Sequence, residues 1–323
     1  MSVQTHQASR RWLPGALLAA LALALVLTGC AQVLPTTYGA APSPEPTLTA
    51  PSAPVLTPTP SAPATPAKPV DPFDTVSAKT KAEFKGCLPK RIGPNSSGKC
   101  AKLVVKKLKA AGYYPWASTS VINVSGANAI LNYQRSRGLK ATATTTKETW
   151  VALATKAAAL PVVLPNKCKT TKGIILCVDQ AHRKLFWIKN GLVVKTFKVR
   201  LGGWNYLAKK HKWKIYATAN GTWKVYDKQV DPKSENYGSG AMPYATMFYP
   251  DMYVHYSPGF HAVGYAQSSH GCVNIGQLSQ AQWIFAHTPI GTPVYVFSPK
   301  AAAVSTQSSE QPKSASPSAT PTS

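Results

Sequence analysis

The sequence predicts an α+β protein with two folded parts, a small three-helix domain followed by a mainly β, sandwich-like domain. Between residues 98 and 155 apolar residues recur at helical spacing. After Lys172 the pattern changes to short apolar or alternating runs separated by turn residues. Both parts are flanked by stretches of Ala, Pro, Ser and Thr, which bury too little apolar surface to fold.

The 323 residues are therefore expected to divide into five segments. The linker is rich in proline, and at about 3.1 Å per residue an extended stretch of ~35 residues would reach roughly 100 Å. The expected segments are a signal at 1–29, a Pro/Ala/Thr-rich disordered linker at 30–72, a helical domain at 85–158, a β domain at 172–298 and a disordered tail at 299–323.

The chain is strongly basic, with 36 Lys and Arg residues against 11 acidic ones and a net charge of +25. Such a charge indicates a polyanionic partner. Nucleic acid is not expected, because no DNA- or RNA-binding motif is present and the chain begins with an export signal. A cell wall rich in phosphate and carboxylate satisfies the same electrostatics. The alternative is a basic surface without a dedicated partner.

The export signal is an apolar run from Leu13 to Thr28, preceded by Arg10 and Arg11. The run is short for a transmembrane helix. It ends in Leu27-Thr28-Gly29-Cys30, which resembles the bacterial lipobox. That resemblance implies cleavage before Cys30 and a lipid on its sulfur, and hence an anchor on the extracytoplasmic face of the membrane. An ordinary signal with an incidental cysteine is the alternative, and the export route stays open.

Six cysteines in an exported chain permit disulfides. Cys272 remains alone after the simplest assignment, and an unpaired thiol in an oxidising compartment indicates that its reactivity is used. The segment 169–173 is predicted to be a hairpin turn. The assignment gives Cys30 to lipid and pairs Cys87 with Cys100 and Cys168 with Cys177.

Three helices are expected in the first folded part. Five short segments follow in the order 105–108, 112–113, 129–134, 138–139 and 149–153. This order resembles a peptidoglycan-binding domain of type 1, which implies that this part binds the wall polymer. The Asp-Gly pair typical of that domain is replaced by Lys140-Ala141-Thr142-Ala143, so a spacer that binds nothing tightly is the alternative. The helices are predicted around Ala101–Leu108, around Ala127–Gln134, and after an N-cap at Thr146.

Six strands are expected in the second folded part, with Asn190-Gly191 as a two-residue hairpin turn. They are predicted at residues 173–179, 184–189, 192–201, 221–227, 253–256 and 293–298.

The chemistry concentrates in Ser269-His270-Gly271-Cys272-Val273-Asn274, with His255 upstream in a strand-like run. A cysteine attacks as thiolate, so an imidazole must take its proton. A glycine beside it lets substrate approach and frees N–H groups for an oxyanion. Zinc bound by Cys272 with His255, His261 and His270 is the alternative, but no second thiolate lies at ligand spacing. We therefore expect neither metal nor cofactor.

These residues resemble the signature of the L,D-transpeptidase family, also called the YkuD domain. The resemblance implies a Cys272 nucleophile and a His255 base. It further implies that His270 shapes the oxyanion region or orients substrate, that Ser269 and Asn274 hold the loop and help to bind donor, and that amides near Gly271 and Cys272 bind the oxyanion. Met242 and Tyr244 are expected to line the cleft. The residue after the base is often Gly in the family but is Tyr256 here.

The family resemblance also implies the substrate, the stem peptide of peptidoglycan. Cys272 would attack the carbonyl of the third residue, release the terminal D-Ala and form a thioester. An amine of a neighbouring stem would complete a 3→3 cross-link, whereas water would give an L,D-carboxypeptidase. One alternative is a non-catalytic wall-binding lipoprotein. Another is a cysteine peptidase, which would form a related acyl-enzyme.

Overall fold

The computed structural model describes residues 70–234 and 237–300. The predicted signal, Cys30, nearly all of the linker and nearly all of the tail lie outside these residues. Within the described ranges, none of the helices is both long enough and apolar enough to cross a membrane.

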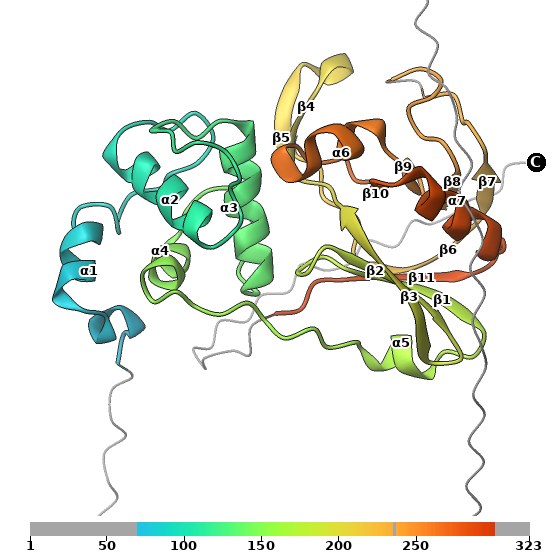
Figure 1. Ribbon diagram of the computed structural model, residues 1–323, viewed down its shortest axis with the longest axis horizontal. Coiled ribbons are helices and arrows are strands. Elements are labelled where there is room, and N and C mark those ends of the chain that lie inside the picture. Colours follow the sequence, from blue (N-terminus) through green and yellow to red (C-terminus); the bar gives the residue numbers. More distant parts are fainter. Residues whose placement is uncertain (1–69, 235–236, 301–323) are drawn as a thin grey trace, which may run out of the picture. The chain divides into compact units, whose positions relative to one another are not determined.

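The first folded part is helical, as predicted (Figure 1). Helices occur at all three predicted places, and α4 begins after Thr146, whose side chain accepts a hydrogen bond from the Thr149 N–H at 3.3 Å. One helix, α1, and a 3-10 turn precede them and were not predicted. The elements are η1 (Pro72–Thr75), α1 (Ala78–Phe84), α2 (Lys99–Ala110), α3 (Val124–Ser136) and α4 (Lys147–Ala154).

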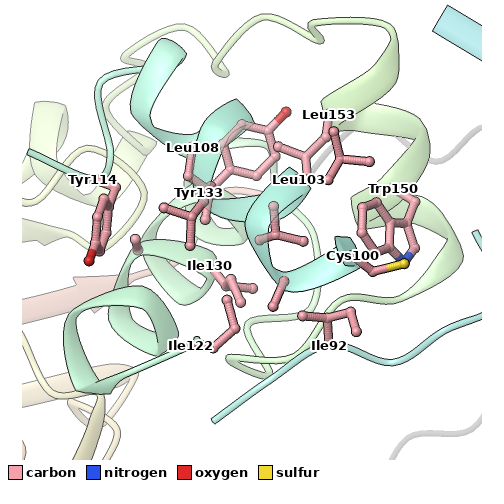
Figure 2. Close-up of a cluster of buried hydrophobic side chains, with 14 of the residues drawn as sticks. Ile92, Cys100, Leu103, Leu108, Tyr114, Ile122, Ile130, Tyr133, Trp150 and Leu153 are labelled. Atoms are coloured by element: carbon pink, nitrogen blue, oxygen red, sulfur yellow. The ribbon is translucent and has the colours of Figure 1, made fainter. Parts of the chain in front are cut away.

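The core of this part is built from the apolar faces of α1 to α4 and the connections between them. Figure 2 shows Leu108, Ile130 and Trp150 among the side chains that gather there, and all three are fully buried. The predicted disulfide between Cys87 and Cys100 is present and ties the chain after α1 to the start of α2. Apolar burial and this cross-link together hold a domain with little regular structure outside its helices.

The second folded part is mainly β, as predicted, but its form is one curled nine-stranded sheet in place of two stacked sheets. The strand order is β6-β11-β1-β2-β3-β10-β9-β8-β7, and the pairs β1–β11 and β9–β10 are parallel. The strands are β1 (Ile174–Asp179), β2 (Lys184–Lys189), β3 (Leu192–Arg200), β6 (Gly221–Lys224), β7 (Asp227–Gln229), β8 (Ala245–Tyr249), β9 (Met252–Tyr256), β10 (Val273–Ile275) and β11 (Pro293–Phe297).

The sheet encloses its own core because β3 pairs with β10 and so joins the two halves. Val178 and Val296 from one half share a buried cluster with Val254 and Val273 from the other. Helix α7 (Leu278–His287) adds Ala281 and Ile284 to that cluster. The remaining elements are a separate hairpin of β4 (Trp204–Leu207) and β5 (Lys212–Ile215), helices α5 (Asn166–Thr170) and α6 (Pro258–Val263), and 3-10 turns η2 (Ala208–Lys210) and η3 (Gly264–Ala266).

The structure corrects two local predictions. Residues 169–173 are not a hairpin turn, because α5 runs to Thr170 and residues 171–173 connect it to β1. The predicted disulfide from Cys168 to Cys177 is present and joins this short helix to the strand. The predicted strand 221–227 is two strands, because β6 ends at Lys224 and β7 begins at Asp227 on the other end of the sheet.

The predicted turn at Asn190-Gly191 is confirmed. Both residues have positive φ, 52° and 79°, which suits a two-residue hairpin between β2 and β3. A side chain at Gly191 would also meet the carbonyl oxygen of Lys169, so only glycine fits there.

Candidate active site

The parallel pair β9–β10 brings the predicted nucleophile and base together. In its register Val254 lies opposite Val273, and His255 lies opposite Asn274. Cys272 precedes β10, two residues before Asn274. Because side chains alternate between the faces of a sheet, His255, Asn274 and Cys272 share one face.

That face forms part of a cavity of about 510 Å³. Six of the residues predicted for the site line this cavity, namely Met242, His255, Ser269, His270, Cys272 and Asn274. The cavity is therefore the candidate active site.

His255 is held in one tautomer. Its Nδ1 donates to the carbonyl oxygen of Tyr256 at 2.5 Å, so Nε2 carries the lone pair. Asn274 donates from Nδ2 to this Nε2 at 2.8 Å, and its Oδ1 accepts a hydrogen bond from Arg200 Nε at 3.0 Å. The arginine thus fixes the amide, and the amide fixes the imidazole. Burial lowers the pKa of His255 to about 4, so the ring is neutral at pH 7.

Cys272 is the one cysteine in the described residues that forms no disulfide. Its Sγ lies 3.7 Å from the carbonyl oxygen of Asp251, in the turn before β9. Burial raises the pKa of the thiol to about 11, although the N–H groups of Tyr253 and Cys272 oppose that rise. The resting nucleophile is consequently a thiol beside a neutral base, not an ion pair.

Ser269 closes the loop before the nucleophile. Its Oγ donates to the carbonyl oxygen of Cys272 at 2.6 Å and accepts from the Gly271 N–H at 3.2 Å. The expectation that the Gly271 amide binds an oxyanion therefore has no support in this geometry, since that N–H is already used. Gly271 has a φ of +122°, and an added Cβ would lie 2.9 Å from the Met252 side chain. The positive φ is the reason that the loop requires glycine, because the Met252 side chain is flexible and could move away from a Cβ.

His270 lies on the wall of the cavity. Its Nε2 donates to the carbonyl oxygen of Tyr206 at 2.9 Å, and its Nδ1 accepts from the Tyr237 hydroxyl at 2.7 Å. Burial lowers the pKa of His270 as well. With both nitrogens occupied, His270 is a neutral fixed ring, suited to orienting a bound chain.

Two further side chains lie apart from the cavity. Tyr244, which was expected in the cleft, packs its ring on Phe285 of α7, and its hydroxyl accepts a hydrogen bond from Gln282 at 3.0 Å. It is not among the described residues that line the cavity. His261 is exposed and bonds through Nδ1 to the carbonyl oxygen of Gly276.

Sequence reasoning missed several residues of the cavity, notably Arg200, Asn205, Tyr206 and Tyr237. Arg200 follows Lys195 and Lys198 in β3, a pattern that is typical of a solvated basic face. Across residues 70–234 and 237–300 no three His, Cys, Asp or Glu side chains are grouped to hold a metal ion. The zinc alternative thus finds no ligand set there.

Several solved structures share similarity with the chain. An L,D-transpeptidase from Xylanimonas cellulosilytica is 20% identical over 65% of this chain and 98% of its own, with a TM-score of 0.35. Another from Stackebrandtia nassauensis is 23% identical over 64% and 98%, with a TM-score of 0.34. A third, from Mycobacterium smegmatis, is 22% identical over 39% and 58%, with a TM-score of 0.29.

No curated protein matches the chain. One family model matches the β domain, over a segment that begins just before β1 and ends within β11. It contains Cys272, His255 and every other residue predicted for the cavity. Residues 173–296 match the YkuD family, the L,D-transpeptidase catalytic domain.

Proposed function

We propose that the protein is a cell-wall L,D-transpeptidase, a cysteine acyltransferase that forms 3→3 cross-links in peptidoglycan through a thioester on Cys272. The observation that carries the proposal is the placement of Cys272 and His255 on one face of β9–β10, inside a cavity, with the lone pair of the base fixed on Nε2. The match of residues 173–296 supports the same reaction class.

Acylation moves one proton and exchanges one bond. The thiol proton passes to Nε2 of His255 as the sulfur attacks the carbonyl carbon of the third stem residue. The carbon–nitrogen bond to the terminal D-Ala then breaks, and the leaving amine takes the proton from the imidazolium. The product is a thioester with a neutral His255.

Deacylation reverses the roles. An acceptor amine gives its proton to Nε2 and attacks the thioester, and the carbon–sulfur bond breaks. The thiolate recovers the proton from His255. Cys272 is thus restored, and the new amide bond is the cross-link.

The resting contacts must change before the first step. The lone pair of Nε2 faces Asn274, and the thiol lies beside the Asp251 carbonyl. A nitrogen that receives a proton cannot keep accepting one from the amide, so the Asn274–His255 hydrogen bond must lengthen or break. Substrate binding is the event that offers the thiol a partner other than Asp251. Because neither group is charged at rest, the thiolate forms only during the attack.

The rest of the chain is proposed to deliver this domain to its polymer. A lipid on Cys30, the proline-rich spacer and a peptidoglycan-binding role for the helical part would place the cavity in the wall layer, with stem peptides as partners and no nucleic acid. The basic net charge of +25 supports attraction to a polyanionic wall.

The first test is covalent trapping. A carbapenem should add its mass to the folded protein at Cys272, and peptide mapping by mass spectrometry should locate the adduct there. Cys272→Ala should abolish it, and His255→Ala should slow it by about 10²- to 10⁴-fold, the usual contribution of a general base. His261→Ala is the matched control and should leave the rate unchanged, because His261 lies outside the cavity.

Absence of an adduct on folded wild-type protein would contradict the catalytic proposal and favour a non-catalytic wall-binding lipoprotein. Product masses separate the two remaining activities. A tetrapeptide donor incubated with an amine acceptor should yield the coupled dimer from a transpeptidase. A carboxypeptidase would yield the tripeptide alone.

A further inference from the structure

Arg200 is the last residue of β3 and lies in the wall of the candidate active site. The side chain is only 7% exposed. Two of its three nitrogens have partners, since Nε donates to Asn274 Oδ1 at 3.0 Å and Nη2 donates to Ser257 Oγ at 3.0 Å. The guanidinium is therefore held in a fixed position.

The third nitrogen, Nη1, is buried and has no hydrogen-bond partner among the described residues. No ion pair involving Arg200 occurs in that part of the chain either. The guanidinium carbon also lies 5.4 Å from the centre of the Phe260 ring, but a phenyl ring cannot neutralise the charge as a carboxylate would. A buried cation without a counter-ion is costly unless a ligand supplies the opposite charge.

The strand registers place this nitrogen close to the chemistry. Arg200 lies opposite Asn274 in β3–β10, and Asn274 lies opposite His255 in β9–β10. Neighbouring strands are about 4.8 Å apart, so the backbone of Arg200 is roughly 10 Å from that of the base. Arg200 and Cys272 line the same cavity, so a peptide chain bound at the sulfur lies in the space that Arg200 borders.

We propose that Arg200 binds a free carboxylate of the donor peptide through Nη1. The inference rests on the proposed function, because it concerns the chain whose carbonyl Cys272 attacks. A guanidinium already fixed on two sides loses little freedom when it binds, and its planar nitrogens suit a carboxylate. The backbone at Gly259 lies beside the group, since an added Cβ would be in ordinary van der Waals contact with Nη2 at 3.5 Å and Nη1 at 4.0 Å.

Binding would also reach the base. Arg200 contributes, after burial, to the low pKa of His255, and its Nε holds the amide that contacts the imidazole. A carboxylate on Nη1 offsets the positive charge that disfavours the imidazolium. The donor would thereby make His255 a stronger base in the complex than in the free protein.

Two carboxylates of a stem peptide could occupy the site, and the experiment separates them. One is the terminal carboxylate of the leaving residue, and the other is the side-chain carboxylate of the attacked residue. Donor peptides are prepared with each group as the free acid or as the amide. The kcat/KM of each donor is then measured for the wild type, Arg200→Gln and Arg200→Lys.

In the wild type the acid should be preferred over the amide about 10- to 100-fold at the carboxylate that Arg200 binds, as expected for a charge-assisted hydrogen bond. Arg200→Gln should bring that ratio close to one, and Arg200→Lys should keep part of it. Arg183→Gln is the matched control. Arg183 packs on the Tyr265 ring, 4.0 Å away, and does not line the cavity, so the ratio should stay as in the wild type.

A purely structural Arg200 would lower kcat/KM for acid and amide donors by the same factor, and that result overturns the proposal. Equal use of acid and amide by the wild type in both arms overturns it as well. Should the wild type turn over no donor, the proposed function fails by itself. The affinity of Cys272→Ala for the same four peptides is then measured by calorimetry. The ratio of acid to amide affinity at each position decides the Arg200 inference.

Discussion

Two buried polar side chains, one in each folded part, differ in how completely they are satisfied. Gln134 in α3 is fully buried, and both ends of its amide are satisfied: the two hydrogens of Nε2 are shared among Thr142 Oγ1, the Thr144 carbonyl and Thr149 Oγ1, and Oε1 accepts from the N–H groups of Thr142 and Ala143. Arg200 in β3 is almost as buried, yet Nη1 has no partner among the described residues.

The comparison separates a structural network from a functional one. Every partner of Gln134 lies within 15 residues of it in the chain, and the network closes the loop between α3 and α4. The partners of Arg200 lie 57 and 74 residues away and belong to the candidate site. The network around Gln134 has no donor left over for a ligand, whereas Arg200 keeps one nitrogen available beside the candidate site.

The largest effect is expected from removing the hydrogen bonds of Gln134. Gln134→Leu should lower the free energy of unfolding by about 3 kcal/mol, because several buried groups lose their partner at once. Urea denaturation measures the change. Asn132→Ala in the same helix is the control and should stay within about 0.5 kcal/mol, since Asn132 is only partly buried.

The rate of carbapenem acylation per folded molecule should be unchanged in Gln134→Leu. A large drop in that rate at full folding would show that the network serves the site, and the distinction drawn between the two side chains would then be wrong.

The next effect concerns the charge beside the base. With the pKa of His255 near 4, the imidazole accepts a proton throughout the neutral range, so acylation should be flat from about pH 5 to pH 9. Below pH 4 the ring is protonated, and the rate should fall about tenfold per pH unit. Acylation rates across pH, with circular dichroism to monitor folding, provide the measurement.

Arg200→Gln removes a charge that lowers the pKa of His255, so the fall in acylation rate at acid pH should begin at a higher pH. A wild-type fall centred near pH 6.5, the ordinary value for histidine, would contradict the burial argument for His255.

The smallest effect compares two helix caps. Thr146 caps α4 and Ser257 caps α6, each through a side-chain oxygen that accepts a backbone N–H. Loss of either hydroxyl by substitution with Ala should cost about 1 kcal/mol of stability in urea denaturation.

Only Ser257→Ala should also raise the KM of the acid donor, because it frees a second nitrogen of Arg200 and lets the guanidinium move. If both variants raised the KM alike, the effect would come from general loosening and not from the arginine.

The helical part was largely predictable because its signals are local. The predicted cap at Thr146 and the apolar spacing around Leu108 and Ile130 depend on residues within one or two turns. The same holds for the Asn190-Gly191 turn, where two positive φ angles follow from residue type. Both disulfides were predicted by short sequence separation, and both are present.

The β domain was predictable in class but not in form. Nothing near Val199 indicates that β3 pairs with β10, some 75 residues later, and that pairing decides between a curled sheet and stacked sheets. The wrong prediction at 169–173 has a local cause. The Thr, Lys and Gly residues there are typical of a turn, but the short helix α5 ends within this segment.

The candidate site divides in the same way. Cys272 and His255 were found through their motif, whose spacing is fixed by one parallel strand pair. Arg200 was missed because it follows Lys195 and Lys198 in a strand rich in basic residues, and only its partners on β10 and beyond β9 distinguish it from them. Tyr237 and Tyr206 reach His270 from loops and a hairpin that carry no sequence signal for that contact.

The raised pKa of the Cys272 thiol has a consequence for the lifetime of the protein. Conditions that form the Cys87–Cys100 and Cys168–Cys177 disulfides would also draw an ordinary free thiol into mixed disulfides. Oxidants and disulfides react with the thiolate, and at a pKa of about 11 only about one molecule in 10⁴ is ionised at pH 7, four pH units lower. The protonated state of the thiol therefore slows oxidation and mixed disulfide formation at Cys272 while no peptide is bound.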